Sequence, residues 1–384
     1  MKRLNRLAHQ IRAKTHIRKS GPTLNYTDDT IRPIARRLSI QRPWLSADEN
    51  WYSALRALRQ GPWRLWIIRF SGDKERSGWD WADFFLKVSI PILILGMSLA
   101  YNKINADHQT KIQSEQREDQ VLTEYLREMN PLLVEKNLKL SPLGSEVRSV
   151  SRGLTLAALS QLSSPKRKTL AIRFLLDSGL NSKPGNLIAL DGADLTGVNL
   201  STSDLRLAKL NDAVLRNADL FAADMRMTSL RSADLSGATL REAFLDSSNL
   251  GDSNLTNSDL RGASMNGALL YSALLRKANL ALAELIRADL RGADLSKANL
   301  EWSNLTGADL TGAKISGAKL YRTNLKASNL SMAELKGVDL SHADLRGANL
   351  QEVRWDKTTI WPQRDMLSHA LNIPSDLRAQ LGIE

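Results

Sequence analysis

A strict five-residue period dominates this sequence. From Leu190 to Leu350 every fifth residue is apolar, so that 33 consecutive positions keep one register without an insertion. The residue is Leu at all of these positions except Met225, Met265 and Ile315. An internal repeat of this length determines the architecture of the region that carries it. The chain must therefore fold in a way that buries one side chain in every five.

Neither a straight helix nor a straight strand can do this. Residues five apart on an α-helix are rotated by roughly 140° about its axis, so the Leu side chains would cover every face. On a strand, residues an odd number apart lie on opposite faces. The chain must turn a corner once per pentad. A small residue stands two positions before each repeat position, as Ala293 does before Leu295. Because two is the strand period, Ala and Leu are expected to point inward and Asp outward.

The unit A-D/N-L-x-x resembles the pentapeptide-repeat family over residues 190–355. The resemblance implies a right-handed quadrilateral β-helix with four pentads per coil. About eight coils at a strand spacing of ~4.8 Å would form a rod near ~40 Å long. The expected fold class is therefore an all-β solenoid over residues 187–355, preceded by a mostly helical membrane-anchoring region.

Both ends of the solenoid are expected to be capped, because an open coil would expose a sheet edge. Apolar residues recur at helical spacing between Ser145 and Leu162, and Ser164-Pro165 has the character of a helix start. We therefore predict a helical hairpin cap over 141–182 and a C-terminal cap over 356–384. The helical segment before the repeats also resembles that of a group of cyanobacterial membrane-anchored pentapeptide proteins.

The positive charge of the chain lies at its front. Of the formal net charge of +12, about ten units come from residues 1–80, and six of the nine Trp residues lie between residues 44 and 81. We interpret 1–80 as a basic, Trp-rich membrane-proximal region. Its basic amphipathic start could bind anionic lipid, touch nucleic acid or remain a solvated tail, and its Trp-rich part could instead be a small soluble helical domain.

A largely apolar run follows this region and predicts a transmembrane helix over 82–102. A buried core helix and a re-entrant segment are the alternatives, because Lys87 interrupts the run. A helical stalk is expected over 103–140. More basic residues precede the span than follow it, which predicts a single-pass protein with a cytoplasmic N-terminus and the repeats in a periplasm or lumen. The residues expected at the membrane interface are Trp63, Trp66, Trp79, Trp81, Lys87 and Tyr101.

The sequence offers no reaction centre. The chain has no Cys, and its five His residues are scattered without metal-ligand spacing. The abundant Asp, Asn and Ser residues suit tight turns, and Ser341-His342-Ala343-Asp344 follows the repeat like its neighbours. We predict a protein that is not an enzyme, with no catalytic, cofactor-binding or metal-binding residues.

These features favour a membrane-anchored scaffold whose rod binds other proteins. The partners are not identified by the sequence, although membrane lipid and a second copy of the chain are candidates. Residues 20 apart stack, so exposed apolar positions can be grouped. One candidate surface comprises Leu282, Trp302, Tyr321 and Arg322, and a second comprises Leu269, Tyr271 and Leu274. Repeat drift, or coverage by the chain's own tail, would explain the same residues.

The alternative function is DNA mimicry, because some pentapeptide-repeat proteins resemble duplex DNA in shape and charge and engage topoisomerases. Residues 190–350 contain 18 basic and 19 acidic residues, whereas a mimic requires dense negative charge. The expected membrane anchor argues in the same direction. The sequence therefore argues against nucleic acid as a partner.

Overall fold

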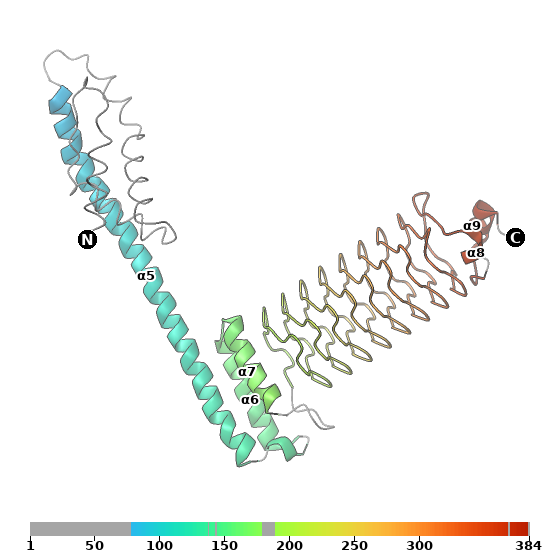
Figure 1. The fold of residues 1–384 in the computed structure, drawn as a ribbon, viewed down its shortest axis with the longest axis horizontal. Coiled ribbons are helices and arrows are strands. Elements are labelled where there is room, and N and C mark those ends of the chain that lie inside the picture. The colour runs from blue at the N-terminus through green and yellow to red at the C-terminus, as the bar shows by residue number, and fades with distance from the viewer. Residues whose placement is uncertain (1–77, 137, 143, 179–188, 368, 383–384) are drawn as a thin grey trace, which may run out of the picture. The chain divides into compact units, whose positions relative to one another are not determined.

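The computed structural model describes residues 78–136, 138–142, 144–178, 189–367 and 369–382. The chain divides into two compact units, Met1–Ala106 and Asp107–Glu384. Its first described element is the 57-residue helix α5 (Gly78–Val134), in which side chains are described from Lys87 onward. The elements that follow are the short 3-10 helix η1 (Leu138–Leu140), α6 (Glu146–Gln161), α7 (Pro165–Asp177), α8 (Arg364–Leu367) and α9 (Ser375–Leu381) (Figure 1).

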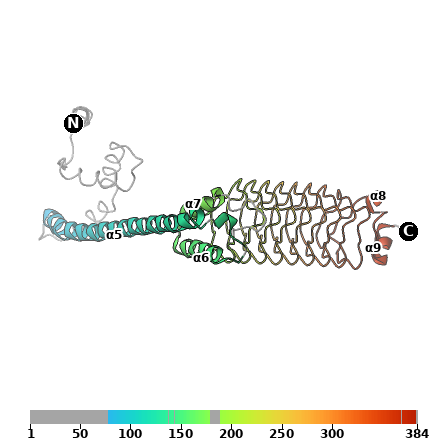
Figure 2. The ribbon, with the colours of Figure 1, turned by 90° about the horizontal axis from the view of Figure 1, so that it is seen from below.

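A stack of coils lies between α7 and α8 and confirms the expected β-helix. Parallel bridges join residues 20 apart, such as Ala189 with Lys209 and Asp194 with Val214. Each bridge is one residue long, so that the coil has four short sides and four corners rather than extended strands. Figure 2 shows the coils following one another along the rod.

Backbone hydrogen bonds hold neighbouring coils together at every pentad. The Leu195 N–H donates to the carbonyl of Val214 at 2.7 Å, and the Val214 N–H donates back to Ala193 at 2.9 Å. A third bond runs from the Gly197 N–H to Arg216 at 2.8 Å. The backbone is thus paired along most of the rod, as a buried main chain requires.

The interior of the rod has the composition that the pentad predicted. Leu260 and Ala263 are fully buried, as are nearly all residues at equivalent positions. Where Ser or Thr replaces Ala, the hydroxyl usually bonds to the backbone: Ser253 Oγ donates to the Leu250 carbonyl at 2.6 Å. The Leu side chains fill the tube, and a small residue occupies the space beside each of them.

Each corner is a tight turn closed by a hydrogen bond. At the first described corner, the Ala193 N–H donates to the Leu190 carbonyl at 3.0 Å, and Gly192 adopts φ of 73°. The third residue of the turn therefore requires the left-handed region, which Gly, Asn and Asp tolerate best. Larger residues at this position pay a conformational cost.

Helices α6 and α7 cover the first coil. The ammonium of Lys168, itself buried, forms an ion pair of 2.7 Å with Asp194. The Asn199 N–H donates to Thr169 Oγ1 at 2.9 Å, so that one polar group of the first coil is satisfied by the cap. The ring of Pro165 lies over Gly197. Helix α7 is therefore fixed to the rod by its polar face.

The second half of α5 packs on these helices. The rings of Tyr125 and Phe174 meet edge to face with centroids 6.2 Å apart, and Tyr125 is buried. Arg167 of α7 pairs with Asp119 at 2.7 Å and with Glu118 at 3.2 Å. Residues 118–134 thus belong to the helical cap.

The C-terminal segment covers the last coil. The ladder offset lengthens there, since Asp339 bridges Ile360 and Asn349 bridges Leu371. Leu367 and Leu377, contributed by α8 and α9, are fully buried. The apolar end of the tube is therefore closed by the chain itself.

The transmembrane prediction over 82–102 is wrong. Within the part of the chain that the structure describes, no helix combines the length and the apolar character needed to cross a membrane. After Lys87, the largely apolar run Val88–Ala100 holds only 13 residues, or about 20 Å of helix against a bilayer core of ~30 Å. It also contains Ser89, Pro91 and Ser98. The single-pass topology, with the N-terminus cytoplasmic and the repeats in a periplasm or lumen, is withdrawn with it.

Burial inside the rod predicts a strong contrast between adjacent residues. Leu260→Asp would place an unpaired carboxylate in the tube and should lower the free energy of unfolding by several kcal/mol, on the order of 4. Asp259→Ala removes a surface pair with Arg261 and should cost less than about 1 kcal/mol. Chemical denaturation of both variants measures the difference, and equal losses would contradict the assignment of inward and outward positions.

The cap contact predicts a pH dependence of stability. Hydrogen bonds from Lys168 and Thr196 lower the pKa of Asp194 from 3.8 to about 2. Because the folded pKa lies below the unfolded one, this contribution is present above pH 3.8 and is lost as the pH falls toward 2. Thermal unfolding of Lys168→Met should therefore differ most from wild type above pH 4 and converge with it toward pH 2. A constant difference over this range would contradict the assignment, and Asp194→Asn serves as the matched variant without a titrating group.

Candidate interaction surface

One corner of the rod carries a continuous stack of large exposed side chains. Leu282, Trp302 and Arg322 occupy the same turn position in successive coils, and Tyr321 precedes Arg322. Leu282 is 63% exposed and Trp302 is 51% exposed. We call these four residues, together with His342 in the next coil, the Trp302 corner.

Four side chains of the Trp302 corner contact one another, and Leu282 lies one coil before Trp302. The Arg322 guanidinium lies 4.5 Å from the Trp302 ring centroid and 5.5 Å from that of Tyr321. The Trp302 and Tyr321 rings meet edge to face at 6.1 Å, and His342 continues the stack at 4.8 Å from Tyr321. The four candidate residues form one surface, to which the structure adds His342.

The backbone at this corner is not the one that such residues prefer. Leu282, Trp302 and Arg322 have φ of 63°, 62° and 55°. A bulky residue in the left-handed region costs about 1–2 kcal/mol relative to Gly. Burial does not offset this conformational free energy, since Leu282 and Trp302 remain exposed. The rod therefore gains little stability from these side chains.

The second candidate surface lies half a coil away, around the diagonally opposite corner. Leu269 and Leu274 flank the turn that carries Tyr271. Tyr271 packs on Gly251 of the preceding coil and leaves no room for a Cβ there. Packing within the rod accounts for Tyr271, and Leu269 is left as a mostly isolated exposed side chain.

A third apolar group was not identified from the sequence. Leu207 and Met227 stack at one corner in the first coils, and Phe244 lies exposed on the adjacent side of the rod. Arg226 lies 6.0 Å from the Phe244 ring centroid. The signal for this group was available, because Met227 and Phe244 occupy outward positions that the repeat usually fills with polar residues.

Most arginines of the rod are neutralised locally. In the commonest arrangement an Asp precedes the repeat Leu and an Arg follows it, as in Asp259 and Arg261, whose side chains form two hydrogen bonds. The Arg261 guanidinium holds the pKa of Asp259 below its usual range. Arg346, the nearest cation, similarly lowers the pKa of Asp344 to about 2. The near-neutral charge of the repeats is thus built from paired groups rather than from separate patches.

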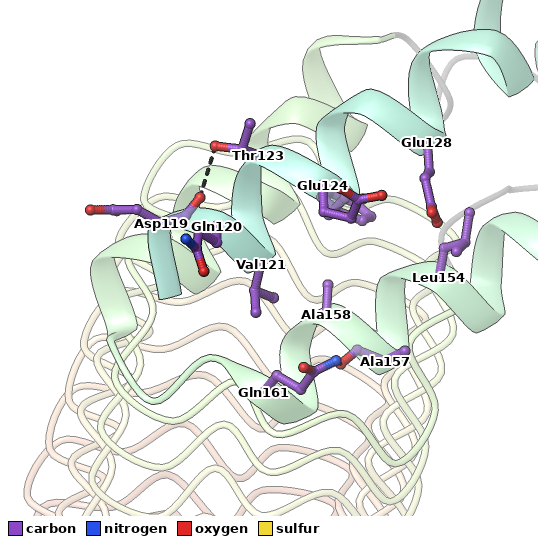
Figure 3. Close-up of a pocket in the computed structure, with 11 residues that line it drawn as sticks. Asp119, Gln120, Val121, Thr123, Glu124, Glu128, Leu154, Ala157, Ala158 and Gln161 are labelled. Atoms are coloured by element: carbon purple, nitrogen blue, oxygen red, sulfur yellow. Dashed lines mark hydrogen bonds between the residues drawn. The ribbon is translucent and has the colours of Figure 1, made fainter. Parts of the chain in front are cut away.

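An open groove of about 680 Å³ lies on the helical cap between α5 and α6. Figure 3 shows Val121 and Ala158 facing one another across it, with Glu124 and Glu128 on the α5 wall. Asp119 at one end pairs with Arg167, and Glu124 pairs with Arg127. The groove brings together apolar and acidic side chains, but no nucleophile with a base.

Groups of His, Asp and Glu that could hold a metal ion are absent from the described part of the chain. His342 stacks on Tyr321, and Asp344 pairs with Arg346 and with Lys326. Ser341, His342 and Asp344 therefore serve separate contacts.

The residues expected at a membrane interface are only partly described. Trp63 and Trp66 lie outside the described residues, and Trp79 and Trp81 lie in α5 before its described side chains begin. Lys87 and exposed Tyr101 lie on α5. Their proposed interface role depended on the transmembrane span, which the structure does not support.

Sequence comparison assigns the rod to a family. The family described as pentapeptide repeats matches in eight copies within residues 189–354. Residues 189–354 are therefore a run of pentapeptide repeats. The expected resemblance is confirmed, and the family fold is the right-handed quadrilateral β-helix.

Solved structures of pentapeptide-repeat proteins are similar to this chain. HetL, involved in heterocyst differentiation regulation in the cyanobacterium Nostoc sp. strain PCC 7120, is 28% identical, with 53% of this chain and 91% of HetL covered and a TM-score of 0.29. Rfr23 from the cyanobacterium Cyanothece 51142 is 25% identical, with coverages of 45% and 90% and a TM-score of 0.10. QnrB1, a plasmid-mediated fluoroquinolone resistance protein, is 21% identical, with coverages of 51% and 95% and a TM-score of 0.32. No curated protein is significantly similar to the chain.

The turn geometry predicts that the exposed Trp can be replaced without loss of stability. In Trp302→Asn, stacking is lost but a residue suited to the left-handed region is gained, so the free energy of unfolding should change by less than about 1 kcal/mol. Trp361 is the matched control, because it is buried at the C-terminal end of the rod. Trp361→Asn should cost about 3 kcal/mol or more. Thermal unfolding of both variants measures the contrast, and similar losses would show that Trp302 has a structural role.

Proposed function

We propose that this protein is a non-enzymatic scaffold whose rod binds a partner protein, and that the Trp302 corner is the contact surface. One observation carries the proposal. Trp302 and Leu282 are large, exposed and held in the left-handed turn conformation, which Gly, Asn and Asp tolerate best. Side chains that cost conformational energy without adding to the core are expected where they serve an interaction.

The composition of the corner agrees with this role. Trp, Tyr and Arg are the residues most often found at the centre of protein interfaces. Trp302, Tyr321 and Arg322 are already in contact before a partner binds. Pre-ordered side chains lose little conformational entropy on binding, which favours affinity.

DNA mimicry remains the less favoured function. A mimic needs a dense row of negative charge, whereas Asp residues of this rod pair with Arg residues two positions along the chain or in the adjacent coil. The Trp302 corner itself carries a cation and aromatic rings. These features suit contact with an ordinary protein surface better than contact with the DNA-binding site of an enzyme.

Site-specific photocrosslinking in the native host tests the proposed surface. A photoreactive amino acid at position 282 should form a discrete adduct, and the same group at position 232, on the diagonally opposite corner, should not. The position 282 adduct should disappear when Trp302→Asn is added, while the melting temperature is retained. An adduct of equal yield at both positions, or one indifferent to Trp302→Asn, would refute this surface.

The mass of the adduct separates two kinds of partner. An adduct at twice the mass of the chain would identify a second copy, whereas any other mass would identify a different protein. In the first case, sedimentation of the purified chain should show a dimer that dissociates in Trp302→Asn.

A further inference from the structure

Arg322 differs from most arginines of the rod in what surrounds its guanidinium. Eight others form ion pairs with Asp of the same or a neighbouring coil: Arg206, Arg216, Arg226, Arg231, Arg261, Arg276, Arg291 and Arg346. Arg322 is stacked on two aromatic rings instead. Among the described residues it forms no ion pair, and Glu301 beside Trp302 does not reach it.

The N–H donors of Arg322 are not used by other described residues. The centre of the guanidinium lies 4.5 Å from the Trp302 ring centroid and 5.5 Å from the Tyr321 ring centroid, and the group carries five N–H donors. No hydrogen bond joins these donors to another described residue. The aromatic contacts limit the orientations of the side chain, so that its donors are held in position before a ligand arrives.

We propose that Arg322 binds a carboxylate of the partner protein, while Leu282 and Trp302 contact an apolar side chain next to that carboxylate. This inference rests on the proposed function and adds the chemistry of the partner. A planar guanidinium binds a carboxylate through two parallel hydrogen bonds, which is the strongest complement to its charge. The nearby apolar surface selects a carboxylate carried on a protein segment over a free anion.

Charge favours a protein over a nucleic acid at this corner. Nucleic-acid binding draws on several phosphate contacts, whereas most cations of the rod already pair with acids. At this corner the Arg322 guanidinium, which forms no ion pair, lies beside exposed apolar groups and matches one acidic residue with an apolar neighbour. Duplex DNA is therefore treated as a competing outcome of the test.

Peptide selection on the purified full chain tests the inference. Random heptapeptides displayed on phage are selected against the wild type, and the enriched peptides are synthesised in acidic form and with Asp→Asn or Glu→Gln. We expect enriched peptides to carry an acid beside an apolar residue, and the amide forms to bind about tenfold more weakly. With Arg322→Gln the acidic and amide forms should bind equally. Arg322→Lys, which keeps the charge but not the planar fork, should keep only part of the preference.

Arg346→Gln is the matched control, because Arg346 already pairs with Asp344. It should keep the wild-type preference for acidic peptides. Loss of that preference in Arg346→Gln and Arg322→Gln alike would overturn the inference, since net charge alone would then explain it.

The remaining outcomes separate the inference from the proposed function. If acidic and amide forms bind the wild type equally but Trp302→Asn abolishes binding, the carboxylate contact is wrong and the surface stands. If Trp302→Asn binds all peptides as the wild type does, or no peptide is enriched, the surface itself is wrong. Duplex DNA that binds through Arg322 in place of peptides would overturn the carboxylate and indicate a phosphate ligand.

Discussion

Burial of one Leu and one small residue in every five is the constraint on which the rod depends. A single coil has no interior of its own, because its Leu side chains are covered only by those of the coils above and below. Stability therefore accumulates along the stack, and both ends need a cover. Lys168 and Asp194 at one end and Leu367 and Leu377 at the other provide it.

The same constraint separates the interior from the surface. Inward positions accept little variation, since Leu260 and Ala263 are fully enclosed. Outward positions need only suit a turn, and a few of them carry residues that do not. At Trp302 the side chain contributes to a surface rather than to the core. Because the repeat is regular, an exposed residue can be compared with the residues at the same position in other coils.

The sequence was informative wherever its period applied. The five-residue period predicts which positions face inward and which face outward. Four pentads per coil then predict that residues 20 apart stack, which groups Leu282 with Trp302 and Arg322. Contacts that depend on how a helix docks did not follow from the period. The pairing of Lys168 with Asp194 requires the orientation of α7 on the first coil, which no sequence spacing encodes.

Two other misses have different physical causes. The membrane prediction weighed apolar content over residues 82–102, although the described run after Lys87 is short for a bilayer. His342 was not grouped with Trp302 and Tyr321 from the sequence. In a solenoid the neighbour that matters is one coil away, and there His342 meets Tyr321.

The lengthened ladder at the C-terminal end has a consequence for assembly. Bridges elsewhere join residues 20 apart, but Asp339 meets Ile360 and Asn349 meets Leu371. A second molecule placed on this end would not find the 20-residue spacing needed to continue the sheet. Repetitive folds of this kind risk growing into fibres. Here the change of spacing blocks end-to-end stacking of molecules, so the protein can keep a highly regular interior without forming fibres.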